Sequence, residues 1–294
     1  MNAIQFVNKL DDLPSLSVVA EQINRAEQKK SLNSKFLSDI IRQDPALAAK
    51  ILKLSNSSYY GQAKQVKTIE RAVTILGFNA VKSLALSISV YNLIKSLKGG
   101  GFDFEGLWHH SLGCAVAAKI LAIGCQSNVA IVENAFLAGI LHDIGLFAIA
   151  FKLPNEMAQM MQLAKDMEWS LAEVEQEILG FTHPKVGGLL AEKWNFPEEY
   201  VIAVKHHHLN YLPAAVRDNH QYNNLIHCVA VGNLLVKAIN IGKSLEPGNG
   251  KIPPSLWNNL GLERRDLPAI REKILASYNM LQASWGGLVI KPGQ

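Results

Sequence analysis

The amino-acid sequence predicts an all-α protein, and three observations carry this prediction. Apolar residues recur at helical spacing along most of the chain, whereas the alternating pattern of strands is scarce. Helix-start and helix-stop signals follow one another at short intervals. The composition, 49% hydrophobic and 18% charged over 294 residues, is that of a chain able to bury a sizeable core. We therefore expect a multi-helical bundle made of two packed lobes.

The first lobe opens with amphipathic helices. Apolar side chains fall on one helical face after Leu13 and again within residues 31–43. Asp44 then provides an N-cap with Pro45 at the first helical position, and the turn-rich residues 56–61 end that helix. These local signals predict three short helices before residue 61.

Two further helices resemble a helix-turn-helix in their spacing. Thr68 caps a short helix over residues 69–76, and a second helix runs from Asn79 to about Leu97 after a glycine. The apolar run at residues 84–90 offers no Arg, Asn or Gln to read base edges. The pattern therefore favours an αα-hairpin packed into the core, and we do not expect DNA as a partner.

A glycine-rich joint at residues 98–101 separates the first lobe from the second. We divide the chain into an N-terminal helical lobe (1–98), a second helical lobe (102–240), and a linker with a C-terminal amphipathic helix (241–294). The helices expected beyond the joint lie at 104–124, 133–150, 155–167, from 170, from 182, 195–208, 222–240 and 262–285. Capping signals at Thr182 and in Ser170-Leu-Ala-Glu173 support these starts.

The predicted helix over residues 133–150 is almost wholly apolar but carries His142 and Asp143 in its middle. Moving a carboxylate into a packed interior costs several kcal/mol or more unless a cation or hydrogen-bond donors meet it. The sequence therefore predicts a source of positive charge or hydrogen bonds at this point. A buried, hydrogen-bonded pair and a metal site both satisfy that requirement.

Composition excludes several classes of protein. The net charge of +4 is spread along the chain, with no basic run that would follow a phosphate backbone. The three cysteines are widely separated, which indicates reduced thiols. The N-terminus lacks the pattern of a signal peptide, and apolar runs are interrupted before the roughly 20 residues needed to span a bilayer. We expect a cytoplasmic protein without a membrane segment.

Six of the nine histidines fall where helices should meet in the core. They form the series His110, His142 (with Asp143), His183, and His206–His207 with His208 beside them. Adjacent helix positions diverge by about 100°, so His109 should face away from His110. Imidazole and carboxylate ligands suit divalent iron, manganese, zinc or magnesium, and a bundle can collect them from several helices.

This order of histidines resembles the HD superfamily of metal-dependent phosphohydrolases. From about Leu13 to Tyr211 the sequence more closely resembles the HDOD family, the HD-related output domain of bacterial signalling proteins. The stretches that carry the resemblance are Leu13-Pro-Ser-Leu-Ser, Asp44-Pro-Ala-Leu-Ala-Ala-Lys-Ile-Leu-Lys-Leu-Ser-Asn-Ser, Ile69-Glu-Arg-Ala-Val-Thr-Ile-Leu-Gly, Trp108-His-His-Ser, Ala135-Phe-Leu-Ala-Gly-Ile-Leu-His-Asp-Ile-Gly, His183-Pro-Lys-Val-Gly-Gly-Leu-Leu-Ala-Glu-Lys-Trp and Val204-Lys-His-His-His.

The resemblance implies an N-terminal lobe, an HD-like lobe and a set of metal ligands. By the superfamily pattern the ligands are His110, His142, Asp143, His183, His206 and His207, with the register within 206–208 left open. Asn233 stands where the superfamily has a last aspartate, and residues 209–213 replace the Gly-Tyr-Pro signature of the related HD-GYP phosphodiesterases. An asparagine carbonyl binds a cation weakly and does not neutralise it.

Two functions follow as expectations from this resemblance. The leading one is a regulatory HDOD protein with little or no catalysis, which binds a signalling protein through its N-terminal lobe and C-terminal tail. The alternative is a metal-dependent phosphohydrolase that acts on a nucleotide or cyclic dinucleotide, with Asp143 as its essential acid.

Overall fold

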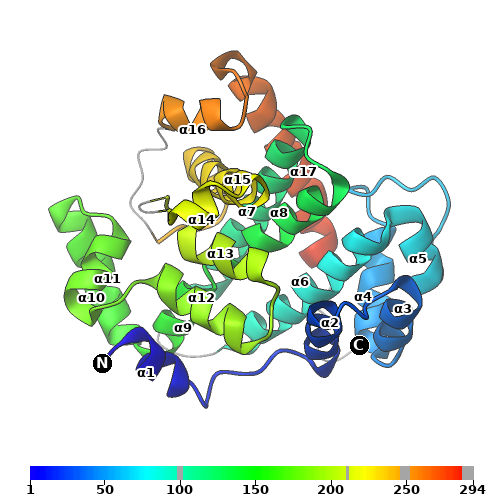
Figure 1. Cartoon of the computed structure of the whole chain (residues 1–294), viewed down its shortest axis with the longest axis horizontal. Helices are drawn as coiled ribbons and strands as arrows, with labels where there is room; N and C mark the ends of the chain where they lie inside the picture. Colours follow the sequence, from blue (N-terminus) through cyan, green and yellow to red (C-terminus); the bar gives the residue numbers. More distant parts are fainter. Residues whose placement is uncertain (98–101, 210–211, 246–251, 287–294) are drawn as a thin grey trace.

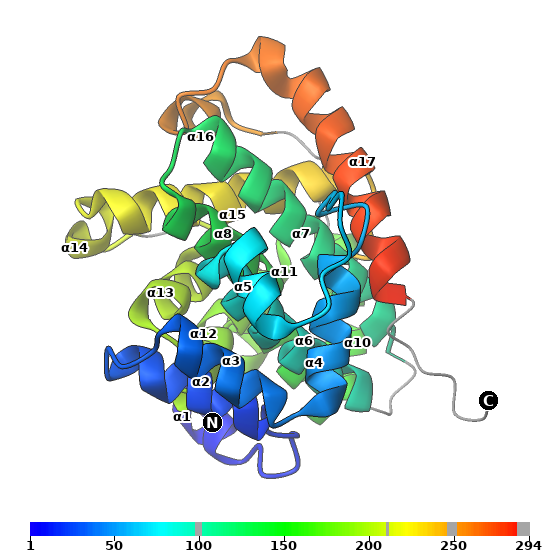
Figure 2. The ribbon, with the colours of Figure 1, turned by 90° about the vertical axis from the view of Figure 1, so that its right-hand side faces the viewer.

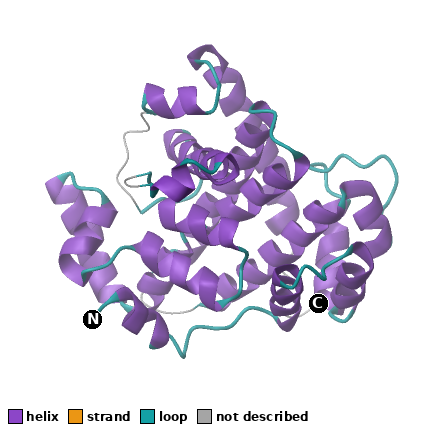
Figure 3. Cartoon of the chain, viewed as in Figure 1, coloured by secondary structure: helices purple, strands orange, loops and turns teal. Residues whose placement is uncertain are grey.

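The computed structural model describes residues 1–97, 102–209, 212–245 and 252–286. Within these ranges every regular element is helical and none is a strand, so the all-α prediction is confirmed (Figure 3). The glycine-rich joint at 98–101 and much of the predicted linker lie outside the described residues, and the division of the chain into lobes stays a prediction.

The N-terminal helices are short, and the caps that the sequence predicts at Asp44 and Thr68 are present. Side chains of Ser17, Asn33, Asp44 and Thr68 accept hydrogen bonds from backbone N–H groups of the first turns that follow them. The helices are α1 (Ala3–Asn8), α2 (Val18–Gln28), α3 (Ser34–Arg42), α4 (Pro45–Ser55), α5 (Ile69–Leu76) and α6 (Phe78–Ser96).

Helix α6 is a core helix. Its residues are buried on nearly every side, serines included, and it packs on α5 within its own lobe and on α8 in the second (Figure 1). Gly77 joins α5 to α6 with φ of +94°, a conformation that favours glycine. The pair is therefore the αα-hairpin expected from residues 68–97.

The second half of the chain surrounds three long, closely packed helices. Helix α7 contacts both α8 and α15, and α17 runs along α7 and reaches α4 of the first half (Figure 2). The helices are α7 (Phe104–Gly124), α8 (Val129–Leu141), α9 (Ile144–Lys152), α10 (Pro154–Met167), α11 (Leu171–Leu179), α12 (His183–Lys193), α13 (Glu198–His206), α14 (Ala214–Arg217), α15 (His220–Ala238), α16 (Pro254–Asn259), the 3₁₀ turn η1 (Arg264–Asp266) and α17 (Leu267–Gly286).

The prediction of a single helix over residues 133–150 is wrong. The structure has two helices there, α8 and α9, and Asp143 is the N-cap position of the second with φ of −99° and ψ of 14°. Helix α9 also lies very close to α12: a Cβ added at Gly145 would come 2.0 Å from the backbone oxygen of His183. Because of this close approach, the residues between α8 and α9 lie next to the first residue of α12.

One segment of the protein is long and apolar enough to cross a membrane by length and composition. It spans residues 129–152, but 89% of its most apolar window is buried inside the protein. Because it consists of α8 and α9, the burial reflects packing against other helices. The cytoplasmic location stays a prediction.

Candidate metal centre

Five polar side chains meet in the interior of the second half of the chain. Helix α7 supplies His110, the break between α8 and α9 supplies His142 and Asp143, α12 begins at His183, and His207 follows the last residue of α13. Each of the five is at most 2% exposed. The structure thus brings together five of the residues that the sequence singled out, and we refer to these five as the His/Asp cluster.

All four imidazoles of the His/Asp cluster turn the same nitrogen toward the carboxylate. The Nε2 atom of His142 lies 3.1 Å from Asp143 Oδ2, and that of His110 lies 3.7 Å from the same oxygen. The Nε2 atoms of His207 and His183 lie 3.5 and 3.7 Å from Asp143 Oδ1. Four rings therefore surround one buried carboxylate.

Two of these rings are held by backbone carbonyls of their own helices. The Nδ1 of His142 lies 2.8 Å from the oxygen of Gly139, and the Nδ1 of His207 lies 2.8 Å from the oxygen of Val204. A carbonyl oxygen can only accept, so both Nδ1 atoms carry hydrogen. In the neutral rings the Nε2 lone pairs then point into the cluster, which is the arrangement of metal-binding histidines.

The third ring is held by a residue that sequence reasoning missed. Glu175 of α11 is fully buried, and one of its oxygens accepts hydrogen bonds of 2.7 Å from both Nδ1 and the backbone N–H of His183. A carboxylate behind a histidine orients the ring and makes its other nitrogen a stronger ligand. The available signal was an acidic residue on the apolar face of the predicted helix that starts at Ser170.

The charges shift the pKa values within the His/Asp cluster. Burial opposes ionisation of Asp143, but the nearby imidazoles of His142, His207 and His183 prevail and hold the pKa of that carboxyl well below its ordinary value. Burial also lowers the pKa of His142, yet the charge of Asp143 prevails and raises it well above 6.5. Burial, together with His208 and His142, holds the pKa of His207 well below 6.5.

A proton on His142 would therefore pair with the carboxylate of Asp143 alone, whereas a metal cation could bind both this carboxylate and the Nε2 lone pairs. Among the described residues, His142 Nε2, His207 Nε2 and Asp143 Oδ1 are buried and make no hydrogen bond. A protonated His142 would pair with Asp143 but would leave the nitrogen of His207 unmet. Imidazole nitrogens and one carboxylate are a donor set for zinc, iron or manganese, so the residues present fit a divalent cation.

Asn233 lies beside the His/Asp cluster, where the sequence placed it. Its Oδ1 atom is 3.1 Å from Nε2 of His110, and its side chain is buried on α15. The amide brings no negative charge, so within the described residues Asp143 is the only carboxylate paired with the four Nε2 atoms.

The three consecutive histidines divide differently from the family pattern. His183, His207 and His208 form a second group whose potential ligand atoms lie within 4.8 Å of one another, next to the group of His110, His142 and Asp143. His206 ends α13 and belongs to neither group among the described residues. His208, which the sequence left outside its ligand set, is partly exposed and has Nε2 3.0 Å from Nε2 of His183.

His109 points away from the His/Asp cluster, as expected. Its Nδ1 is hydrogen-bonded, at 3.0 Å, to the hydroxyl of Tyr278, which belongs to α17. The C-terminal helix is thus fastened to α7 one residue away from His110.

This fold and these residues define an HD-type helical protein, and comparison with known families supports that class. The model of the HDOD domain matches residues 13–210. The chain therefore belongs to the HDOD family.

Known proteins of similar sequence or structure share the fold at low identity. An HDOD domain protein of unknown function from Geobacter sulfurreducens is 24% identical with a TM-score of 0.78, over 98% of this chain and 97% of that one. A candidate phosphohydrolase from Shewanella amazonensis is 23% identical with a TM-score of 0.71, over 97% and 98% of the two chains. An uncharacterised protein of Treponema pallidum is 24% identical over 81% of this chain but only 45% of its own length. The chain thus spans less than half of that relative.

Proposed function

We propose that this protein is a regulatory HDOD module that acts by binding a signalling protein, and that its His/Asp cluster holds a divalent cation as part of the folded core. The observation that carries the proposal is the burial of the whole cluster. Asp143 is 2% exposed and the four histidines are 1% exposed or less. A phosphate ester has to come within about 3–3.5 Å of its nucleophile to react, and none of these five side chains is exposed to receive it.

The charge of the cluster supports the same proposal. A hydrolytic centre with two metal ions needs fixed negative charge to hold both ions and to lower the pKa of a bound water. Asp143 supplies one such charge, and Asn233 beside it supplies none. Glu175 accepts hydrogen bonds from the backbone N–H and Nδ1 of His183 and does not face the four Nε2 atoms.

One observation favours a metal-dependent phosphohydrolase instead. The group of His183, His207 and His208 adjoins the first group of ligands, and His208 is the member that solvent reaches. If two cations bound side by side there, this histidine would mark the entry for a nucleotide or cyclic dinucleotide. The two proposals are therefore separable by activity.

The decisive experiment measures metal content and phosphodiesterase activity on the same sample. Protein purified without chelators should contain a divalent metal, whereas Asp143→Asn should contain almost none. With manganese or iron added, neither should hydrolyse cyclic di-GMP or bis-p-nitrophenyl phosphate. The matched control is Asp166→Asn, which alters an exposed carboxylate on α10. Turnover that only Asp143→Asn removes would reverse the ranking of the two functions.

Exposed apolar side chains give the partner-binding proposal a starting point. Phe36 on α3 is 39% exposed and Leu275 on α17 is 46% exposed, so each half of the expected contact surface carries one. In affinity capture, Phe36→Asp and Leu275→Glu should each reduce the amount of the same partner protein that binds. Val129→Asp is the control, because Val129 is 73% exposed on α8 of the other lobe. A partner lost only with Val129→Asp would contradict this choice of surface.

A further inference from the structure

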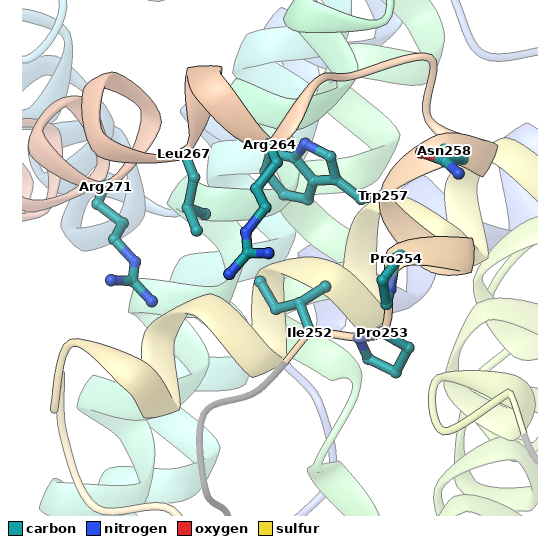
Figure 4. Close-up of a pocket in the computed structure, with 8 residues that line it drawn as sticks. All are labelled: Ile252, Pro253, Pro254, Trp257, Asn258, Arg264, Leu267 and Arg271. Atoms are coloured by element: carbon teal, nitrogen blue, oxygen red, sulfur yellow. The ribbon is translucent and has the colours of Figure 1, made fainter.

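A pocket of about 560 Å³ is lined by residues between 252 and 271, which follow the HDOD match over residues 13–210. It is formed by α16, η1 and the first turns of α17, above α15 (Figure 4). None of its lining residues belongs to the His/Asp cluster. They are Ile252, Pro253, Pro254, Trp257, Asn258, Arg264, Leu267 and Arg271.

Two guanidinium groups give this pocket its charge. Arg264 and Arg271 extend to the same side, with Leu267 between them (Figure 4). In the described part of the chain no carboxylate pairs with either of them. Neighbouring Arg265, by contrast, is bound to Glu263 at 2.8 Å. The Nε atom of Arg271 is buried and has no hydrogen-bond partner.

The remaining wall of the pocket is apolar and partly flat. Trp257 is 5% exposed, and its indole N–H is buried without an acceptor. Ile252, Leu267 and Pro254 add aliphatic surface around it. Guanidinium groups recognise phosphate oxygens through paired hydrogen bonds, and they and indole rings also stack on planar rings.

We propose that this pocket is a binding site for a nucleotide, with the phosphate on Arg264 and Arg271 and the base against the wall formed by Trp257 and Leu267. Its volume lies within the range of small-molecule pockets, which combine apolar walls with a few well-placed polar groups. An acidic peptide would satisfy the two arginines but would leave the apolar wall of Ile252, Pro254 and Leu267 without a matching surface. The site shares no residue with the His/Asp cluster, and Arg271 lies on the same helix, α17, as Leu275 of the proposed partner contact.

The bound nucleotide would connect parts of the chain that otherwise meet at few points. Arg264 lies in η1 and Arg271 in α17, whereas Trp257 lies in α16. A ligand held by all three residues restrains the start of α17 relative to α16. Amide hydrogen exchange in both helices should therefore slow when the nucleotide binds.

The test uses the full chain and AMP or GMP labelled with a methylanthraniloyl group. Fluorescence anisotropy should report saturable binding that unlabelled AMP or GMP reverses. Arg264→Gln and Arg271→Gln should each weaken binding by about tenfold or more, since each removes a charge-assisted contact to phosphate. Arg265→Gln, the matched control, should bind as the unchanged protein does.

Four results would overturn the proposal. The first is the absence of saturable binding by either labelled nucleotide. The second is competition by inorganic phosphate as strong as that by AMP, which would indicate an anion site without recognition of a base. The third is stronger displacement by hexaglutamate than by AMP or GMP, which would indicate an acidic peptide. A weakening by Arg265→Gln equal to that by Arg271→Gln would likewise show that general surface charge causes the binding.

Discussion

The His/Asp cluster and the pocket around Arg264 and Arg271 both contain polar atoms without partners, but they differ in their access to water. In the cluster such atoms are enclosed: His207 Nε2 and Asp143 Oδ1 have no hydrogen-bond partner and almost no exposure. In the pocket, Arg271 Nε and the indole N–H of Trp257 are likewise buried without a partner among the described residues, but neighbouring Arg264 is exposed and water can solvate it. Unmet polar groups in a dry interior destabilise the fold itself, whereas solvated ones do not. The comparison indicates a resident ion at the first site and an exchangeable ligand at the second.

The largest expected effect comes from Asp143→Asn. The change removes the charge that four imidazoles surround, and breaking a buried charge pair from one side costs about 3–5 kcal/mol. We expect loss of bound metal by elemental analysis and a free energy of unfolding in urea reduced by about that amount.

Asp166→Asn should retain the metal content and the stability of the unchanged protein, because surface substitutions stay within about 0.5 kcal/mol. If Asp143→Asn matched this control in both measurements, the cluster would be an ordinary hydrogen-bonded core, and its contrast with the arginine pocket would disappear.

A smaller effect is expected from Glu175→Gln, which keeps the shape of the side chain behind His183. Residues that orient a metal-binding histidine alter metal affinity by about 10–100-fold when substituted. Titration against a chelator should therefore show weaker binding, with the helical circular dichroism retained. Glu173→Gln on the same helix is the control, because Glu173 is exposed and only caps α11. Equal affinities for the two variants would remove Glu175 from the site.

The pH dependence of stability distinguishes a proton from a cation in the cluster. In chelated protein the pKa of His142 is raised, so its stabilisation is complete below about 6.5 and is lost as the pH rises toward its folded value. His207, with a lowered pKa, acts in the opposite sense and loses stability as the pH falls below about 6.5. Asp143 adds a further loss as the pH falls below about 3.9.

Chelated protein should therefore lose stability on both sides of a maximum near the ordinary pKa of histidine. Metal-loaded protein should instead gain stability up to neutral pH, because ligand histidines bind metal only when neutral. Urea midpoints measured across pH with and without chelator make the comparison. Identical profiles would mean that no cation occupies the cluster under either condition.

Sequence reasoning reached the parts of this structure that depend on neighbouring residues. The caps at Asp44 and Thr68 are local, and they were predicted correctly. The break before Ile144 was missed because the apolar run continues past Gly139 and Gly145 on either side of it; the close packing of α9 on α12 depends on residues about 40 positions away. Helical spacing likewise could not choose among residues 206–208, since α13 ends at His206.

The candidate sites show the same limit. Glu175 contacts His183 across the turn that joins α11 to α12, so the spacing of eight residues carries no helical meaning. The pocket requires the segment from Ile252 onward to fold back on α15, a contact between distant parts of the chain. Tertiary packing therefore decides which polar residues meet, even where each helix is predictable.

The smallest change in the free energy of unfolding is expected for the double variant Arg264→Gln with Arg271→Gln. Neither side chain is ion-paired within the described ranges, so their loss in unliganded protein should change the free energy of unfolding by less than about 0.5 kcal/mol. Removing like charges from nearby helical turns also removes their mutual repulsion, which can raise the free energy of unfolding slightly. Urea unfolding of the double variant beside Asp143→Asn measures this directly. A loss comparable to that of Asp143→Asn would mean that the arginines hold the fold together, and the pocket would then be a structural joint like the cluster.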